Sequence, residues 1–451
     1  MRGAFRLQVL LIAGILVAQP GAASSPVRGA RRRAVAPAPD SASTQKFEVN
    51  GLPVILRRNT ANEVVVANLY LLGGTRQLTR ATAGIEALLL AASERGTKRF
   101  PGASVRQRTA RLGSTIGVEA NNDWSAIGLH AIRATFDSTW AILAERVMAP
   151  TLDAGEVAIV RDQFLAVARE RMTQPDDAAN ELADSLLYAG HPNAISTSGT
   201  PESIPTLTVA KLKQYHASQF VTSRMMLVVV GNVDRAQVER LVRSTIATLP
   251  RGTYRWMSPP PIPPGGRAIA LDNRPLPTNY LLGYAPGPAA TDPDYVALRV
   301  ATAVLSGRLF TEVRSRRNLS YAVEAPFLER AYAVGGLYVT TVDPNRVLAL
   351  MRQELNTLQT ESVDPAGLRR LEQQFITEYY LKNETNADQA NVLARAELYQ
   401  GDYRNADRFM DALRRVTADD VRRVARRYLK DFRFAYVGDV SRLDRGLLQQ
   451  F

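Results

Sequence analysis

The segment Gly84-Ile-Glu-Ala-Leu-Leu-Leu-Ala-Ala-Ser-Glu-Arg-Gly-Thr97 consists almost entirely of helix-favouring residues, and Gly96 is placed to end the helix. The apolar run Val64–Leu72 comes before it and has the composition of a buried strand. A Gly-Gly pair between the two favours a turn. The sequence therefore predicts a strand, a turn and a helix in that order.

Further strands and helices are predicted on both sides of this unit. Asn50-Gly51 lies between two short runs of alternating apolar residues, which is the strongest short signal of a β-hairpin. C-terminal to the unit, apolar residues recur at three- and four-residue spacing, which is typical of amphipathic helices. The predicted helices are residues 105–112, 136–148, 155–172 and 208–220, and the predicted strands are residues 114–121, 125–131 and 225–231.

The second half of the chain repeats the order of the first. A helical segment that begins at Thr208 precedes an apolar run ending at Gly231, and a similar segment from Thr417 precedes one ending at Gly438. The threonines are 209 residues apart and the glycines 207, which indicates a duplication. A Pro- and Gly-rich segment separates the copies. The prediction is two α+β domains, at residues 46–250 and 268–451, joined by a linker at 251–267.

The N-terminus has the pattern of an export signal. A basic start, an apolar run and a small-residue site predict a cleaved signal peptide at residues 1–23, with an uncleaved membrane anchor as the alternative. Residues 24–45 are rich in Arg, Ala, Pro and Ser and are expected to form a disordered basic tether. The predicted location is therefore periplasmic or secreted.

Composition limits the partners that the chain can have. It contains no cysteine, so disulfides and a lipoprotein anchor are both excluded. The formal net charge of +13 favours acidic partners or surfaces. No nucleic-acid-binding motif accompanies this charge, so nucleic-acid binding is not expected.

The helix at residues 84–97 resembles the zinc helix of the insulinase/pitrilysin family of metallopeptidases. In active members this helix carries H-x-x-E-H, followed closely by a Gly-Thr pair. Counting back from the Gly-Thr pair here, the two histidine positions fall on Ala87 and Ala91, and the general-base position falls on Leu90. The position of the later glutamate ligand falls on Val167. None of these side chains has a donor atom, so the resemblance implies a degenerate zinc site.

The resemblance covers residues 47–441 and implies the bowl-shaped fold of insulinase and mitochondrial processing peptidases. That fold is α+β, with two duplicated sandwich-like domains in which helices pack on a mostly antiparallel sheet. The three histidines, His130, His191 and His216, lie far from one another in the sequence and off the former zinc helix. We expect His191 to belong to a structural loop and the other two to be half-buried packing residues.

A second segment, Gly307-Arg-Leu-Phe-Thr-Glu-Val-Arg-Ser-Arg-Arg-Asn-Leu-Ser-Tyr321, resembles the S-R-L-F-x-x-x-R-x-x-x-x-L-x-Y motif of the family. There the arginine and the tyrosine reach the zinc-bearing domain and hydrogen-bond the substrate. The matching positions are Arg314 and Tyr321. The alternative is that Arg314 is a solvated surface residue and Tyr321 a packing residue of a strand.

Residues 113–120 resemble the edge strand on which active members hold an extended peptide. Ser114, Ile116 and Val118 are the expected positions along it, because addition of a peptide to a sheet edge gives affinity through backbone hydrogen bonds. The alternative is an ordinary edge strand covered by a neighbouring segment.

With the zinc residues replaced and the Arg/Tyr pair kept, the sequence resembles the metal-free subunit of heterodimeric family members. The resemblance implies an exported chain that is inactive alone and supplies Arg314 and Tyr321 in trans. Zinc is expected in the partner subunit, and the substrate is expected to be a short or unfolded peptide. A scaffold or assembly subunit on the same fold is one alternative, and a homodimeric peptide-binding protein is another.

Metal analysis of the purified, untagged chain is the first test of this hypothesis. After dialysis against micromolar zinc and then metal-free buffer, mass spectrometry of the metal content is expected to find far less than stoichiometric zinc. The reason is that alanine, leucine and valine side chains cannot coordinate the ion. A stoichiometric amount would contradict the prediction.

Overall fold

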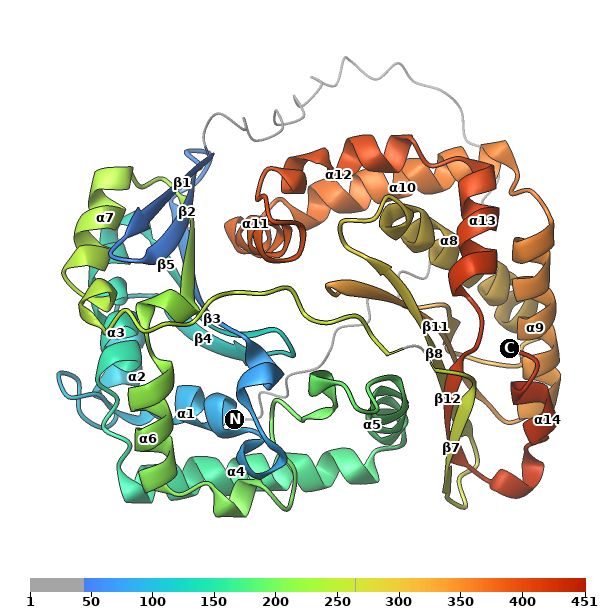
Figure 1. The fold of residues 1–451 in the computed structure, drawn as a ribbon, viewed down its shortest axis with the longest axis horizontal. Coiled ribbons are helices and arrows are strands. Elements are labelled where there is room, and N and C mark those ends of the chain that lie inside the picture. The colour runs from blue at the N-terminus through green and yellow to red at the C-terminus, as the bar shows by residue number, and fades with distance from the viewer. Residues whose placement is uncertain (1–43, 264) are drawn as a thin grey trace, which may run out of the picture. The chain divides into compact units, whose positions relative to one another are not determined.

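The structure is a computed structural model that describes residues 44–263 and 265–451 (Figure 1). The predicted signal peptide, and most of the predicted tether, lie outside the described residues. The first strand begins at Thr44, inside the segment expected as tether. Thr44 pairs with Arg57 in a hairpin and accepts a 2.8 Å hydrogen bond from its Nε, so the folded part begins slightly earlier than predicted.

The first sheet has six strands in the order β1-β2-β6-β3-β5-β4. β1 and β2 form the predicted hairpin, and Asn50 and Gly51 have the positive φ angles, 51° and 82°, that its tight turn requires. β4 is an edge strand. The strands are β1 (Thr44–Val49), β2 (Leu52–Arg58), β3 (Val64–Leu72), β4 (Thr115–Ala120), β5 (Trp124–Ile132) and β6 (Met225–Gly231).

Helices of the same half cover one face of this sheet. The described helices are α1 (Ile85–Ala92), α2 (Ser104–Arg111), α3 (Phe136–Met148), α4 (Ala154–Thr173), α5 (Pro175–Leu187), α6 (Val209–Gln219) and α7 (Arg235–Arg243). α1, α3, α4, α6 and α7 share one buried apolar core with the strands. α1 contributes Leu88, Leu89 and Leu90 to it, all fully buried, so this helix is part of the core of the domain.

The second sheet has the order β10-β11-β8-β12-β7, with β9 also paired to β11. Its strands are β7 (Ala268–Asn273), β8 (Asn279–Ala289), β9 (Val323–Glu324), β10 (Phe327–Leu328), β11 (Tyr332–Thr341) and β12 (Arg433–Gly438). The described helices of this half are α8 (Asp294–Leu309), α9 (Pro344–Thr360), α10 (Pro365–Lys382), α11 (Asn386–Gln400), α12 (Asn405–Arg414), α13 (Ala418–Tyr428) and α14 (Arg445–Leu448). α8, α9, α10, α12, α13 and α14 contribute to the second core.

The two sheets share a distinctive pairing. β6 runs parallel to β2 and β12 runs parallel to β7, whereas the neighbouring pairs are antiparallel. β6 and β12 follow helices whose N-caps are Thr208 and Thr417, and each threonine hydroxyl accepts a backbone N–H of its helix. The repeated segments of the sequence therefore occupy matching places in the two sheets.

A helix of each half packs on the sheet of the other half. Ala390, Leu393 and Ala394 of α11 form a buried cluster with residues of β2, β3, β5 and β6, on the face that the helices of the first half leave free. Conversely, Ala179 and Ala183 of α5 pack with residues of β8, β11 and β12. Since both exchanged helices bury apolar residues in the other half, two separate apolar contacts hold the halves together.

Polar contacts reinforce this exchange. Nη2 of the buried Arg57 of β2 donates to both carboxylate oxygens of Asp407 of α12, at 2.7 and 3.0 Å. Asn386 Nδ2 at the start of α11 donates to Val64 O at 2.6 Å. The connecting segment also packs, because Trp256 Nε1 donates to Leu398 O at 3.1 Å although residues 250–263 and 265–267 form neither helix nor strand. Within the described part of the chain, no helix is long and apolar enough to cross a membrane.

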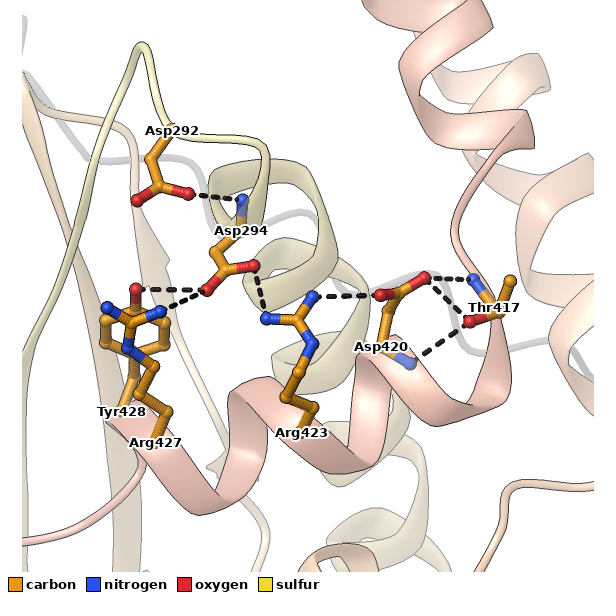
Figure 2. A network of polar contacts seen from close by, with 7 residues as sticks. All are labelled: Asp292, Asp294, Thr417, Asp420, Arg423, Arg427 and Tyr428. Carbon is orange, nitrogen blue, oxygen red and sulfur yellow. Dashed lines mark hydrogen bonds and ion pairs between the residues drawn. The ribbon is translucent and has the colours of Figure 1, made fainter.

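A network of charged residues fixes α13 against the start of α8 (Figure 2). The carboxylate of Asp294, which is 5% exposed, accepts bonds from Arg423 Nη1 at 2.6 Å, Arg427 Nη1 at 3.2 Å and Tyr428 Oη at 3.1 Å. Burial, followed by the hydrogen bond to Asp294, raises the pKa of Tyr428 to about 12, so the phenol stays protonated and donates. Arg423 also contacts Asp420, the third residue of α13.

Removal of this carboxylate is expected to weaken the second half. Asp294→Ala should lower the free energy of unfolding by about 2 kcal/mol, because charge-assisted hydrogen bonds to a buried group are lost. Denaturant titration measures this. Asp419→Ala is the matched control, because Asp419 pairs with Arg422 but its side chain is 80% exposed, and its loss should leave stability nearly unchanged. Equal effects of the two variants would contradict the prediction.

Candidate functional site

α1 is held at its N-terminus by close backbone contact. Gly84, the N-cap, has a φ of 85°, and a Cβ at this position would lie 2.7 Å from the Cα of Gly199. Ser203 Oγ donates to Ala83 O at 3.0 Å from the same loop. A side chain at Gly84 or Gly199 would clash with the facing loop, so this contact needs glycine at both positions and fixes where α1 begins.

The four positions that the resemblance assigns to the zinc site lie on α1 and α4, which pack against each other. Leu90 is fully buried, Ala87 is 9% exposed and Ala91 is partly buried against the core. Val167 of α4 is 53% exposed. These side chains carry no N, O or S donor, so the residues present do not fit a zinc ion. Among the described residues, no group of three or more His, Cys, Asp and Glu is arranged to hold a metal.

The one carboxylate of α1 that lies beside these positions is already engaged. Glu86 Oε2 accepts from Tyr215 Oη at 2.8 Å and lies 2.7 Å from Arg224 Nη2. Glu86 and Arg224 are 3% and 1% exposed, and Arg224 Nε donates to Leu72 O at 2.7 Å. Burial, then the nearby Glu86, raises the pKa of Tyr215, which keeps the phenol protonated. This triad attaches the first turn of α1 to β3 and α6.

The three histidines lie apart and have separate roles. His191 Nδ1 accepts the backbone N–H of Asn193, and its Nε2 lies 3.1 Å from Pro260 O, so the ring is a structural bridge to the connecting segment. His216 is half-buried, with Nε2 2.7 Å from Val147 O. Burial lowers the pKa of both rings. His130, in contrast, is exposed on β5, so its expected half-buried packing is wrong: its side chain points away from the core, unlike those of its neighbours in the strand.

Arg314 and Tyr321 lie together in the second half. α8 continues into a π-helical turn, Phe310–Ser315, a geometry that is common at functional sites. The Arg314 guanidinium lies 5.1 Å from the centre of the Phe310 ring and 5.7 Å from that of Tyr321. Tyr321 is 82% exposed and Phe310 46%, so the alternative of Tyr321 packing on a core does not occur. Tyr321 therefore stands on the surface, and the partly buried Arg314 lies against its ring.

Neighbouring arginines differ from Arg314 in their charge partners. Arg308 pairs with Glu354 at 3.6 Å, and both Arg316 and Arg317 pair with Glu312 at 2.5 Å. Among the described residues, Arg314 has no ion pair. Nor do the described contacts join it to α1 or α4 of the same chain. Its guanidinium is therefore free to bind an anionic or carbonyl group from elsewhere.

β4 has the alternating exposure of an edge strand, with Ile116 and Val118 packed partly against the first core. Ser114 precedes the strand, and its buried hydroxyl accepts from Thr139 Oγ1 at 3.0 Å and donates to Thr109 O. Of the three expected edge positions, Ile116 and Val118 are in the strand, and Ser114 is in the turn before it.

Known proteins resemble this chain over most of its length. Residues 206–375 match the family described as Peptidase M16 inactive domain. An uncharacterized zinc protease of Mycobacterium leprae is 24% identical over 392 residues, which are 84% of this chain and 87% of that protein. The β subunit of the mitochondrial-processing peptidase of Blastocladiella emersonii is 23% identical over 411 residues, 86% of each chain. The crystal structure of a peptidase M16 inactive domain from Pseudomonas fluorescens has a TM-score of 0.82 at 22% identity, and covers 88% of this chain and 98% of that one.

The resemblance to the insulinase/pitrilysin (M16) family is confirmed. The predicted fold class is confirmed with it, because the M16 fold has two α/β halves with helices packed on mixed sheets. Sequence reasoning did not find two features of this chain, the buried Glu86–Arg224 pair and the π-helical turn at Arg314. The sequence indicates the buried pair only through Glu86, a charged residue inside an apolar helix, and this pattern does not identify Arg224 as its partner.

Loss of the buried carboxylate on α1 is expected to destabilise the first half. Glu86→Gln leaves Arg224 charged and uncompensated, so the free energy of unfolding should fall by about 3 kcal/mol. The double variant Glu86→Leu with Arg224→Leu removes both charges and should recover part of this loss. Denaturant titration compares both with Glu63→Gln, an exposed control. If Glu86→Gln resembles that control, the ion pair does not stabilise α1.

Proposed function

We propose that the chain is the non-catalytic subunit of an exported heterodimeric zinc peptidase of the M16 type, to which it contributes Arg314 and Tyr321 in trans. The observation that supports this most strongly is the contrast between the two sites. Ala87, Ala91 and Val167 have no donor for a metal, whereas Arg314 has no charge partner among the described residues and Tyr321 is 82% exposed.

The chemistry of this pair suits peptide hydrolysis. Attack on a peptide carbonyl places negative charge on its oxygen, and a guanidinium and a phenol are the donors that stabilise such a charge. Each donor aimed at this oxygen contributes about 3 kcal/mol to the barrier reduction in comparable sites. The ring contacts of Arg314 with Phe310 and Tyr321 restrict the guanidinium before substrate binds, which reduces the entropy lost on binding.

The substrate in this proposal is a short or unfolded peptide, held along β4. An edge strand offers backbone donors and acceptors to any extended chain and reads little of its sequence. The zinc, and the base that activates water, belong to the partner subunit.

The alternative is a scaffold or assembly subunit on the same fold. A scaffold does not need an arginine and a tyrosine with accessible donors, whereas a subunit that acts on substrate does. Substitution at Arg314 and Tyr321 therefore distinguishes the two functions, because it lowers activity only if the pair contacts substrate.

Substitution of the pair in the complex tests the proposal. The complex is obtained by pulldown from the native envelope or secreted fraction, and its zinc content and peptidase activity are measured. Arg314→Ala is expected to lower kcat about 100-fold, and Tyr321→Phe about 10-fold or more, because each loses a donor to the developing charge. Partner binding should persist in both variants.

Arg316→Ala is the matched control, because Arg316 lies two residues away but its side chain is 66% exposed and paired with Glu312. Its activity should equal that of the unmodified complex. Full activity of the double variant Arg314→Ala with Tyr321→Phe would reject the proposal in favour of a scaffold. A chain that is recovered alone and inert would also reject it.

A further inference from the structure

Arg146 of α3 is a buried arginine whose hydrogen-bond acceptors are neutral groups. It is 1% exposed, and among the described residues it forms no ion pair. Its guanidinium instead donates to three neutral acceptors: Ser93 Oγ at 3.1 Å, Ile116 O at 3.2 Å and Leu90 O at 3.3 Å. A buried cation is costly unless its donors are satisfied, so each of these contacts is needed to hold the side chain in place.

Two of the acceptors come from the end of α1. Leu90 O is one of the last carbonyls of the helix, which have no partner within it, and Ser93 is the C-cap. A cation near a helix C-terminus is favoured by the helix dipole. The third acceptor, Ile116 O, belongs to β4, so Arg146 joins the former zinc helix to the edge of the sheet.

The backbone of β4 alternates between β5 and the free edge. Asn121 N donates to Trp124 O in the turn that joins the strands, and the register from Thr115 to Ala120 has no irregularity. In an antiparallel pair, the N–H and C=O of alternate residues point away from the neighbouring strand. The outward set is therefore Ile116, Val118 and Ala120. The contact of Ile116 O with Arg146, rather than with β5, agrees with this assignment.

We propose that Arg146 determines the register of a peptide on β4, because its guanidinium occupies the outward carbonyl of Ile116 and ends strand addition there. The proposal rests on the peptide-binding edge of the proposed function. An added strand exchanges backbone bonds with Val118 and Ala120. At Ile116 the guanidinium of Arg146 already donates to the carbonyl oxygen, so an N–H of the peptide finds no acceptor there. Pairing beyond Val118 would leave a buried N–H unsatisfied, which is unfavourable.

This assignment gives Arg146 a positioning role in addition to its packing. A peptide can extend past Ala120 towards the β4–β5 turn, but not past Val118 towards Ser114. The bound length is limited at one end by a side chain from α3, and this limit is independent of the sequence of the peptide. The same side chain contacts α1 at Leu90 and Ser93, so the peptide end stops next to the degenerate zinc positions.

Amide hydrogen exchange with single-residue resolution tests this on the full chain alone. The probes are acetylated and amidated peptides made of threonine, valine and lysine. They are about six, eight and ten residues long, which suits addition to a short strand. In the unmodified chain, exchange is expected to slow about tenfold or more at Val118 and Ala120 and to stay unchanged at Ile116. In Arg146→Leu, Ile116 should be protected as well, and the longest peptide should bind about fivefold more tightly, the effect of one added hydrogen bond.

Two further variants distinguish the positioning role of Arg146 from a general loss of folded structure. Arg146→Lys keeps the charge, but an ammonium cannot reach three acceptors, so Ile116 should become partly protected. Arg243→Leu removes an exposed arginine of α7 and should behave as the unmodified chain. Thermal unfolding shows whether each variant is folded. The exchange pattern of the unmodified chain tests the proposal even if a variant does not fold.

The outcomes distinguish this proposal from the one on which it rests. Protection of Ile116 in the unmodified chain would overturn the role of Arg146 and leave the peptide edge intact. Unchanged exchange throughout β4 in both the unmodified chain and Arg146→Leu would overturn the peptide edge itself, and the role of Arg146 with it.

Discussion

The exchange of α5 and α11 between the two halves is the constraint on which the rest of the structure depends. Each sheet has two apolar faces, and the helices of its own half cover only one of them. The second face of each packs against a helix of the other half and against residues of the connecting segment, and Ala406 of α12 also covers the first sheet. Ion pairs such as Arg57–Asp407 lie at the margin. Because burial of apolar surface is the main stabilising contribution, neither sheet is complete without the opposite half.

Packing within its own half explains why α1 is a stable helix without any metal-binding residue. α1 contributes Leu88, Leu89 and Leu90 to the first core, and its first turn is attached through the Glu86–Arg224 pair. The alanine, leucine and valine at the positions that the resemblance assigns to the zinc site have no donor atoms but fit the apolar pattern, so α1 packs in the core without a metal. Tyr321 and Arg314 are the reverse case, because Tyr321 is 82% exposed and Arg314 beside it is only partly buried. Their presence is better explained by contacts with another molecule than by stability.

The sequence predicts local elements of this fold well, because periodicity and turn residues determine them. β3, α3 and β6 begin and end where the apolar pattern does, and Asn50-Gly51 forms the tight turn that its composition favours. Contacts between distant residues cannot be read from such patterns. The burial of Arg146 and the exposure of His130 depend on which side of an element faces a neighbour, and a lone charged residue in an apolar segment does not reveal its partner. The helix exchange is likewise invisible, because nothing in the residue patterns of α5 and α11 shows which sheet each helix covers.

The reciprocal packing of α5 and α11 also bears on the covalent link between the halves. A chain cut within residues 250–263 would yield two pieces that each retain a helix buried in the other, so cleavage need not separate them. Such pieces behave as complementing fragments, and each would expose an uncovered apolar sheet face if it were made alone. Duplication in this protein has therefore produced two interdependent halves rather than two domains that can be exchanged or expressed singly.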